Sequence, residues 1–236
     1  MELRSGLRKS PTSIRWSDKR GIMSETKNCG NKPVVRFAGF ADAWEQRKLS
    51  DICTMHARIG WQNLRTTEFL DKGEYYLITG TDFDDGIINF GTCHYVMRDR
   101  FDQDRNIQIS NGSILITKDG TLGKVAFIEG LDKPATLNAG VFNLIISDKE
   151  MNGVFLFQYL KAPFLMNYVT CKATGGTIKH LNQNILVDFP VRSPKVQEQE
   201  RLGAFFSEID SAVVLHQREL DELKELKKSL LQKMFI

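Results

Sequence analysis

Two glycine-bearing polar segments hold the residues best suited to bind a charged ligand. In the first, residues 118–124 with the sequence KDGTLGK, two lysines and a threonine stand beside Gly120 and Gly123. Glycine lets the backbone approach a phosphate closely, and lysine and threonine donate hydrogen bonds to its oxygens. An ordinary tight turn explains the same residues equally well. The phosphate contacts predicted from this segment are Lys118, Thr121 and Lys124.

The second segment, residues 172–180 with the sequence KATGGTIKH, is denser in cations and backbone donors. It predicts contacts from Lys172, Thr177, Lys179 and His180. For a nucleic-acid ligand, the side chains that read bases would instead come from the loops between predicted strands, within residues 58–65 and 98–106. Arginine is the residue type best suited to read guanine edges. The predicted base contacts are therefore Arg65, Arg98, Arg100 and Arg105.

Motifs for catalysis are missing from the sequence. A methyltransferase needs a glycine-rich strand–turn–helix for its cofactor and an Asn-Pro-Pro-type motif, and neither residues 39–40 nor 184–190 supply one. The four histidines have no metal-ligand spacing and no obvious nucleophile partner. They are His56, His94, His180 and His216. We predict no catalytic residue, no metal site and no cofactor.

Two acidic patterns admit a metal or nuclease interpretation. Asp82, Asp84 and Asp85 lie in one turn between predicted strands, where a solvated turn is far more common than a metal site. Asp119 with Lys124 or Glu129 resembles the acid and lysine set of a nuclease, but the glycines around Asp119 favour a turn.

Short strands with a few helices must position these loops, which predicts an α+β domain. Packing begins at Trp44 and Leu49. A helix over residues 155–166 is expected to break at Pro163. Strands are predicted at residues 75–79, 87–90, 113–117, 125–128 and 141–146, with a short one near 186–187.

A long amphipathic helix, or two joined end to end, is predicted over residues 197–233, which contain no proline and no glycine after Gly203. At 1.5 Å per residue it would span roughly 55 Å. Its outer half therefore needs another helix to pack on. A kink is expected first at residues 207–210, where a serine or an aspartate can cap a second helix. Steps of three and four give an apolar seam with two polar members that penalise wrong registers. The seam, the predicted dimerisation surface, is Ile209, Val213, His216, Leu220, Leu223, Lys227, Leu230 and Met234.

Charge and composition divide the chain into three parts. Residues 1–32 hold eight basic side chains against three acidic ones and predict a disordered basic tail, of which 1–22 need not belong to the natural product. Residues 33–194 form the predicted domain, and 195–236 the helical region. The net charge of +3 is too small to predict nucleic-acid binding by itself.

Membrane and secretory signals are missing from the sequence as well. No uninterrupted apolar run reaches the length that spans a bilayer, and the N-terminus lacks a signal peptide, so a cytoplasmic location is expected. The four cysteines have no CxxC spacing, which predicts reduced thiols and neither a disulfide frame nor a zinc site.

Four segments together carry a family resemblance. Residues 33–52, 112–129, 173–186 and 189–235 stand in the order found in the specificity (S) subunit of type I restriction–modification systems, and the likeness covers almost everything after residue 32. The chain resembles that family. The resemblance implies a non-catalytic target recognition domain that reads double-stranded DNA, followed by a coiled-coil helix that spaces two such domains and docks the methyltransferase (M) subunits. Restriction (R) subunits would join through the M subunits.

One departure from the family pattern sets the expected assembly. The ordinary S subunit has two recognition domains and two helical regions, whereas this sequence has one of each and resembles a half-subunit. We therefore expect an antiparallel homodimer on a bipartite target, with pairing to a different half-subunit as the open alternative. A second hypothesis is a coiled-coil scaffold protein whose globular domain binds another protein.

Overall fold

A computed structural model describes residues 23–25, 33, 35–60, 63–172 and 180–235. By its internal contacts the chain divides into two units, residues 1–43 and 44–236. In the first unit, β1 (Met23–Glu25) pairs antiparallel with β2 (Val35–Phe37). Arg36 there donates a hydrogen bond to the carbonyl oxygen of Asp42 at 2.5 Å. Strand β1 falls within the segment that the sequence predicts to be a disordered tail.

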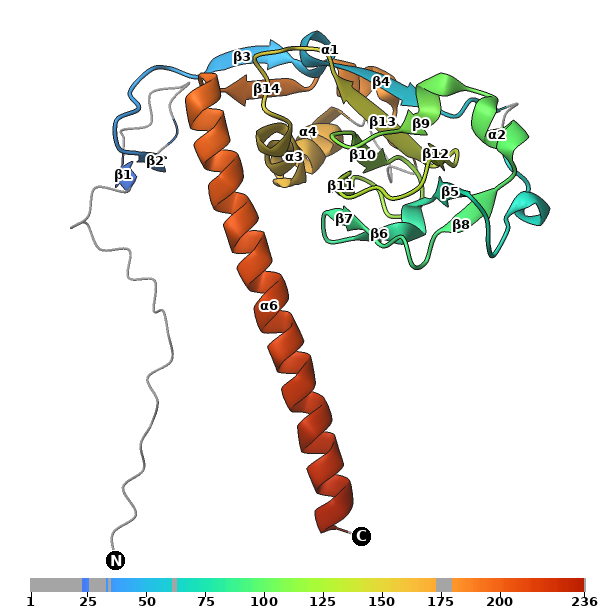
Figure 1. The fold of residues 1–236 in the computed structure, drawn as a ribbon. Helices are drawn as coiled ribbons and strands as arrows, with labels where there is room; N and C mark the ends of the chain where they lie inside the picture. Colours follow the sequence, from blue (N-terminus) through green and yellow to red (C-terminus); the bar gives the residue numbers. More distant parts are fainter. Residues whose placement is uncertain (1–22, 26–32, 34, 61–62, 173–179, 236) are drawn as a thin grey trace, which may run out of the picture. The chain divides into compact units, whose positions relative to one another are not determined.

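Two four-stranded sheets form the centre of the second unit (Figure 1). The first is wholly antiparallel, in the order β11-β10-β13-β4, and comprises β4 (Cys53–Ala57), β10 (Ile114–Thr117), β11 (Val125–Phe127) and β13 (Val141–Ile146). The second, in the order β8-β5-β12-β9, contains one parallel pair, β5 with β12. Its strands are β5 (Tyr75–Ile78), β8 (His94–Val96), β9 (Gln108–Ile109) and β12 (Ala135–Leu137).

Two strand pairs and several short helices complete the domain. The pairs are β3 (Glu45–Lys48) with β14 (Pro190–Ser193), and β6 (Phe83–Asp84) with β7 (Ile87–Ile88). The α-helices before the long one are α1 (Leu49–Ile52), α2 (Arg98–Asp102), α3 (Gly153–Lys161), α4 (Phe164–Lys172) and α5 (Gln183–Val187). The 3₁₀ helices that lie wholly within the described residues are η2 (Thr66–Glu68), η3 (Gly80–Asp82) and η4 (Arg105–Ile107).

The helical break at Pro163 is confirmed, since it separates α3 from α4. The strand predicted near residues 186–187 is wrong, because these residues belong to α5. The Asn182 side chain caps that helix by accepting a hydrogen bond from the Asn184 amide at 2.9 Å, and Leu186 turns into the core. The apolar run over residues 185–187 is too short to show a helical or strand period, and the Asn182 cap makes it helical.

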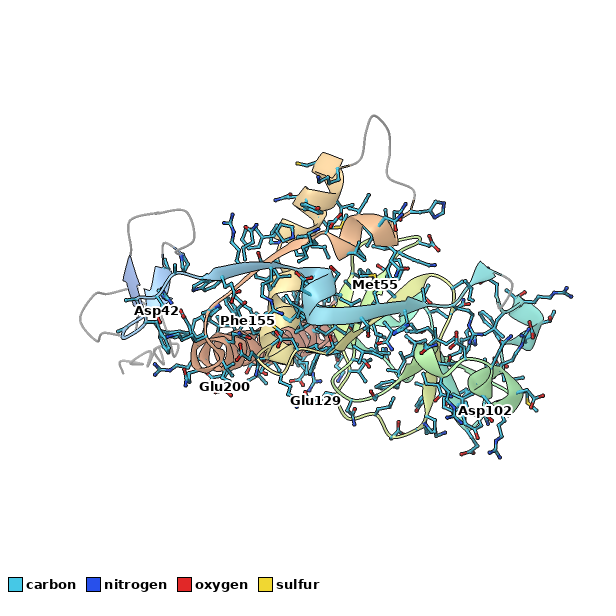
Figure 2. All side chains as sticks on the ribbon, turned by 90° about the horizontal axis from the view of Figure 1, so that it is seen from above. Asp42, Met55, Asp102, Glu129, Phe155 and Glu200 are labelled. Carbon is cyan, nitrogen blue, oxygen red and sulfur yellow. The ribbon has the colours of Figure 1, made fainter. Side chains whose placement is uncertain are left out.

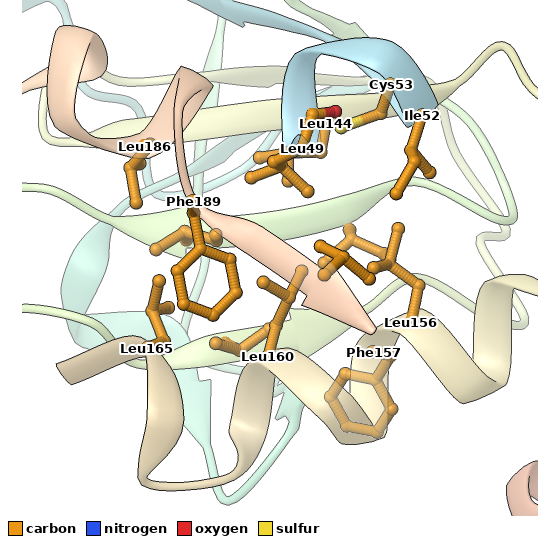
Figure 3. Packing of buried hydrophobic residues seen from close by; sticks show 14 of the residues in the cluster. Leu49, Ile52, Cys53, Leu144, Leu156, Phe157, Leu160, Leu165, Leu186 and Phe189 are labelled. Carbon is orange, nitrogen blue, oxygen red and sulfur yellow. Dashed lines mark hydrogen bonds between the residues drawn. The ribbon is translucent and has the colours of Figure 1, made fainter. Parts of the chain in front are cut away.

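The first sheet is buried on both faces. Along β10, Ile114 and Ile116 join the core beneath α3, α4 and α5, while Leu115 joins the core of the second sheet. Alternate residues of a strand face opposite sides, so an unbroken apolar run is what a covered sheet requires. Figure 3 shows the helical side of this packing, with Leu49 and Phe189 among the side chains that fill it. Leu49 is thus confirmed as an anchor.

Helix α6 (Val196–Met234) is continuous over 39 residues. Its first turns dock on α3, and a Cβ added to the buried Gly203 would lie 3.2 Å from the Phe155 amide nitrogen. Of the two forms predicted, one long helix is confirmed. Residues 207–210 do not begin a second helix, because Asp210 bonds side chains of α3 instead of capping one. No helix in the described ranges is long and apolar enough to cross a membrane.

The described cysteines differ in burial and are therefore expected to differ in reactivity. Cys53 and Cys93 are buried, which raises the pKa of each thiol to about 12, while Cys171 is exposed. Only the thiolate is nucleophilic, and at pH 8 about one in ten thousand of the buried thiols is ionised. A brief pulse of a thiol reagent on the native protein is expected to modify Cys171 and to spare Cys53 and Cys93, as read by peptide mass spectrometry. The denatured chain serves as the control, and equal labelling of all three in the native state would contradict the buried environments.

Candidate nucleic-acid interface

The loop over residues 118–124 joins β10 to β11 and is ordered by the buried Thr117. The Thr117 hydroxyl donates to the Thr121 carbonyl oxygen and accepts from the Lys124 amide at 2.9 Å. Gly120 and Gly123 both have φ near +72°, a conformation that favours glycine. A Cβ on Gly123 would lie 2.1 Å from Met166 Sδ, so this glycine lets the loop pack on α4. The loop is therefore a tight turn, which was one of its two predicted interpretations. It still carries Lys118 and Lys124, which suit phosphate contacts.

The predicted contacts in this loop lie in different surroundings. Lys124 and Thr121 are exposed. Lys118 is half-buried, with Nζ 5.3 Å from the centre of the Phe142 ring, and its carbonyl oxygen accepts from the Leu181 amide at 2.8 Å. Next to Leu181, His180 places Nδ1 2.5 Å from Asp119 Oδ1. The structure thus brings Lys118, Thr121, Lys124 and His180 into one group, which we call the loop cluster.

Lys172 is the last residue of α4 and is exposed, with Nζ 5.7 Å from the centre of the Tyr168 ring. Thr177 and Lys179 lie outside the described residues. Asp119, considered as a nuclease acid, is paired with His180.

The four predicted arginines lie on or beside three short helical segments, η2, α2 and η4. Glu68 joins the segments, since one carboxylate oxygen accepts from the Arg65 amide at 2.8 Å and the other from Arg100 Nε at 2.7 Å. The hydrogen bond from the Arg65 amide is the main reason that the pKa of Glu68 lies below its usual range, and the bond from Arg100 is the next. Glu68 is therefore ionised. Figures 1 and 2 place α2, which ends at Asp102, at the end of this unit away from α3 and α6. We call Arg65, Arg98, Arg100 and Arg105 the arginine group.

The members of the arginine group differ in how free their guanidinium groups are. Arg100 donates from Nε to Glu68 and from Nη1 to Gln103 Oε1 at 3.2 Å, so it serves the fold. Arg98 is exposed and paired with Asp102 one turn later at 3.2 Å. Arg65 and Arg105 are exposed. Three of the four arginine side chains therefore lie on the surface.

Arg58 lies in one of the predicted base-reading loops but is buried, with 2% of its surface exposed. Its Nε donates to the Leu137 carbonyl oxygen at 2.8 Å, and Nη2 to Thr136 Oγ1 at 3.2 Å. Nη1 shares Gln103 Oε1 with Arg100. Burial lowers the pKa of Arg58, with nearby Arg100 as a smaller cause. Sequence reasoning missed this role because Thr136 and Leu137 are distant in the chain.

The acidic turn also differs from expectation. Asp82 is buried, not solvated, and accepts from the Thr79 amide at 2.7 Å and the Thr92 hydroxyl at 3.0 Å. Asp84 and Asp85 are exposed, as predicted. Across the stretches that the structure describes, no three acidic, histidine or cysteine side chains gather in a way that could hold a metal ion.

The seam of α6 is exposed throughout the helix. Its apolar members are between 40% and 73% exposed, Ile209 the least and Met234 the most. Successive helical residues are about 100° apart, so the seam and the face docked on α3, marked by Gly203 and Asp210, point in different directions. A row of large apolar side chains left open to water indicates an interaction surface.

Comparison with known proteins assigns the chain to a family. A family model, the type I restriction modification DNA specificity domain, matches residues 41–225. The chain belongs to this family. The match covers both candidate DNA-contact groups and most of the seam, so the type I specificity family resemblance is confirmed.

Relatives and solved structures of the specificity family agree. The chain is 25% identical over 201 residues to the putative type I restriction enzyme MjaX specificity subunit of Methanocaldococcus jannaschii, covering 81% of this chain and 45% of the relative. It is 23% identical over 131 residues to the MjaVIII specificity subunit of the same organism, covering 56% of this chain and 30% of the relative. The chain spans less than half the length of these curated relatives.

Two S-subunit structures share the fold. The type I S subunit from M. genitalium has a TM-score of 0.54 at 18% identity, over 82% of this chain and 46% of that one. The HsdS subunit from Thermoanaerobacter tengcongensis has a TM-score of 0.55 at 17% identity, over 84% and 46%. The predicted fold class, an α+β domain of short strands followed by a long helix, is confirmed.

Proposed function

We propose that this chain is the non-catalytic DNA sequence-recognition subunit of a type I restriction–modification enzyme. The observation that carries the proposal is the family match over residues 41–225, which includes both DNA-contact groups. In this proposal the chain positions M subunits, and R subunits through them, on a bipartite double-stranded target. It supplies no catalytic residue, metal or cofactor of its own.

The loop cluster and the arginine group would divide the work of DNA binding. Lys118, Thr121 and Lys124 suit phosphate contacts, because such contacts fix orientation without reading sequence. The exposed Arg65, Arg98 and Arg105 suit guanine edges. Arg100 instead holds Glu68, which accepts from the Arg65 amide, and shares Gln103 with the buried Arg58.

The seam of α6 would pair with the seam of a second copy in the antiparallel direction. The steps between successive seam residues alternate between four and three, and their order is the same in both chain directions. One antiparallel register therefore places every seam residue opposite a seam residue of the second copy. That register sets Leu220 against Leu223, Val213 against Leu230, and Ile209 against Met234. The two polar members, His216 and Lys227, then share a layer. Polar groups that meet only in the correct register select that register.

Salt dependence of DNA binding provides the test. We expect the chain, in complex with its M subunits, to bind and methylate a bipartite site, with affinity that falls steeply as salt rises because phosphate contacts release counterions. Replacing Lys118 and Lys124 together with glutamine should reduce the slope of log affinity against log salt by roughly two. The measurement is fluorescence anisotropy over a salt series, with methylome sequencing to identify the target.

The matched control is Lys149→Gln, which removes an exposed lysine on the turn after β13. Its salt slope should equal that of the unmodified chain. Binding that does not respond to salt, together with an unmethylated genome, would contradict the proposal and favour the scaffold alternative.

A further inference from the structure

Lys161, the last residue of α3, contacts two other elements at once. Its Nζ lies 3.1 Å from the Asp85 carbonyl oxygen and 3.2 Å from Asp85 Oδ1, at the tip of the β6–β7 hairpin. The same nitrogen lies 3.3 Å from Asp210 Oδ1 on α6. A single ammonium group therefore links α3, the hairpin and the long helix.

Asp210 is held through both of its carboxylate oxygens. Oδ2 accepts from Gln158 Nε2 at 2.7 Å, and Oδ1 faces Lys161. Gln158 and Lys161 are three residues apart on α3, a spacing that puts their side chains on one face. Exposed ion pairs contribute little to stability, but the Lys161 side chain is only 25% exposed and its carboxylate partner has a second donor.

The hairpin is itself fixed, so the link has a rigid base. Gly86 has φ of +103°, and a Cβ there would lie 2.9 Å from Phe157 Cζ and 3.3 Å from Lys161 Nζ. Its carbonyl oxygen accepts from the Phe127 amide of β11 at 2.9 Å. The hairpin tip is therefore packed on α3 and bonded to the first sheet.

The link lies where α6 leaves the domain. Gly203 is buried and Asp210 half-buried, whereas nearly every described residue from Ser211 onward is exposed. Beside the link, α6 and the hairpin enclose an open groove of about 850 Å³, lined by Ile87, Phe157 and Val214 among others. Because side chains do not fill this groove, packing alone does not set the direction of the helix beyond Asp210.

We propose that Lys161, with Gln158 and Asp210, fixes the angle between the recognition domain and the helical region, and thereby sets the spacing between the two half-sites. Lys161 is a positioning residue that acts through α6 without touching DNA. The spacing step rests on the proposed function, whereas the angle does not.

The angle is measured with spin labels at Asp71→Cys in the domain and Glu222→Cys on α6, both exposed positions, in a chain with Cys29 and Cys171 replaced by serine. Labelled chains are diluted with unlabelled ones, and distances come from pulsed electron resonance. Lys161→Met keeps an unbranched apolar side chain but removes the ammonium group, which lies 6.0 Å from the centre of the Phe157 ring. It should broaden the distance distribution about twofold, and Lys161→Arg should restore the original width because arginine can bond both partners.

Lys228→Met is the matched control, since it removes a lysine paired with Glu225 within α6 and should leave the width unchanged. An unchanged width in Lys161→Met would overturn the proposal. Spacing is then measured by methylation of sites whose half-sites stand one base pair closer or farther apart. Lys161→Met should raise methylation at these sites about fivefold relative to the preferred spacing, with half-site sequences unchanged.

The two steps fail separately. A broader distribution with an unchanged spacing preference would refute the spacing step. If the unmodified chain supports no methylation at any bipartite site, the proposed function fails, and the distance measurement still decides whether Lys161 fixes the angle.

Discussion

Replacing Leu220 and Leu223 with aspartate is expected to abolish self-association of this chain. In the antiparallel register these two leucines face each other at the centre of the seam, and they are 47% and 63% exposed in the single chain. Pairing would bury four unpaired carboxylates per dimer, each at a cost of several kcal/mol. Affinity should fall by at least about a thousandfold. Sedimentation velocity at micromolar concentration should find a dimer for the unmodified chain and a monomer for the variant.

Leu215→Asp provides the matched control. Leu215 is 56% exposed and lies on α6 outside the seam, so this charge should leave the dimer intact. If the double variant remains dimeric, the seam is not the pairing surface. If the unmodified chain is monomeric and methylated sites are asymmetric in both halves, the partner is a different half-subunit.

Arg58→Met is expected to reduce the free energy of unfolding by about 2–4 kcal/mol. The substitution leaves the Leu137 carbonyl oxygen, the Thr136 hydroxyl and the Gln103 amide oxygen without the donor that the buried guanidinium supplies. Chemical denaturation followed by circular dichroism measures the loss. Lysine at this position should recover only part of the stability, because one ammonium group cannot reproduce the planar set of donors.

Arg98→Met is the comparison for this measurement. Arg98 is exposed and, among the residues that the structure describes, pairs with Asp102 on its own helix. Its replacement should therefore change stability by less than about 0.5 kcal/mol. Equal losses in the two variants would show that Arg58 does not support the fold as its hydrogen bonds indicate.

Elements with strong local signals could be predicted from the sequence. Strand β13 has the bounds predicted for it, and Pro163 marked the end of α3 because proline cannot continue a helix. The period of α6 is also local, so its seam was visible. The direction of the helix could not be predicted from the sequence, because Asp210 is held by Gln158 and Lys161, which lie about fifty residues away in the chain.

The candidate site was predictable only where its signals are local in the sequence. The turn at Gly120 and Gly123 has a local signature, and the structure keeps Lys118 and Lys124 beside it. The pairing of Asp119 with His180 joins residues 61 positions apart, which no short motif indicates. The loop over residues 58–65 was expected to be exposed, and the burial of Arg58 was not predictable because its partners lie 78 and 79 positions away.

The crossing of α6 over α3 at Gly203 gives the long helix the mechanics of a lever. A side chain at Gly203 would push against the Phe155 amide and the Val154 side chain, so the glycine holds the fulcrum close to the domain. Asp210 lies about 10 Å along the helix from Gly203 and Met234 about 46 Å. A displacement of 1 Å at Asp210 therefore swings Met234 by about 4–5 Å, which exceeds the roughly 3.4 Å between successive base pairs.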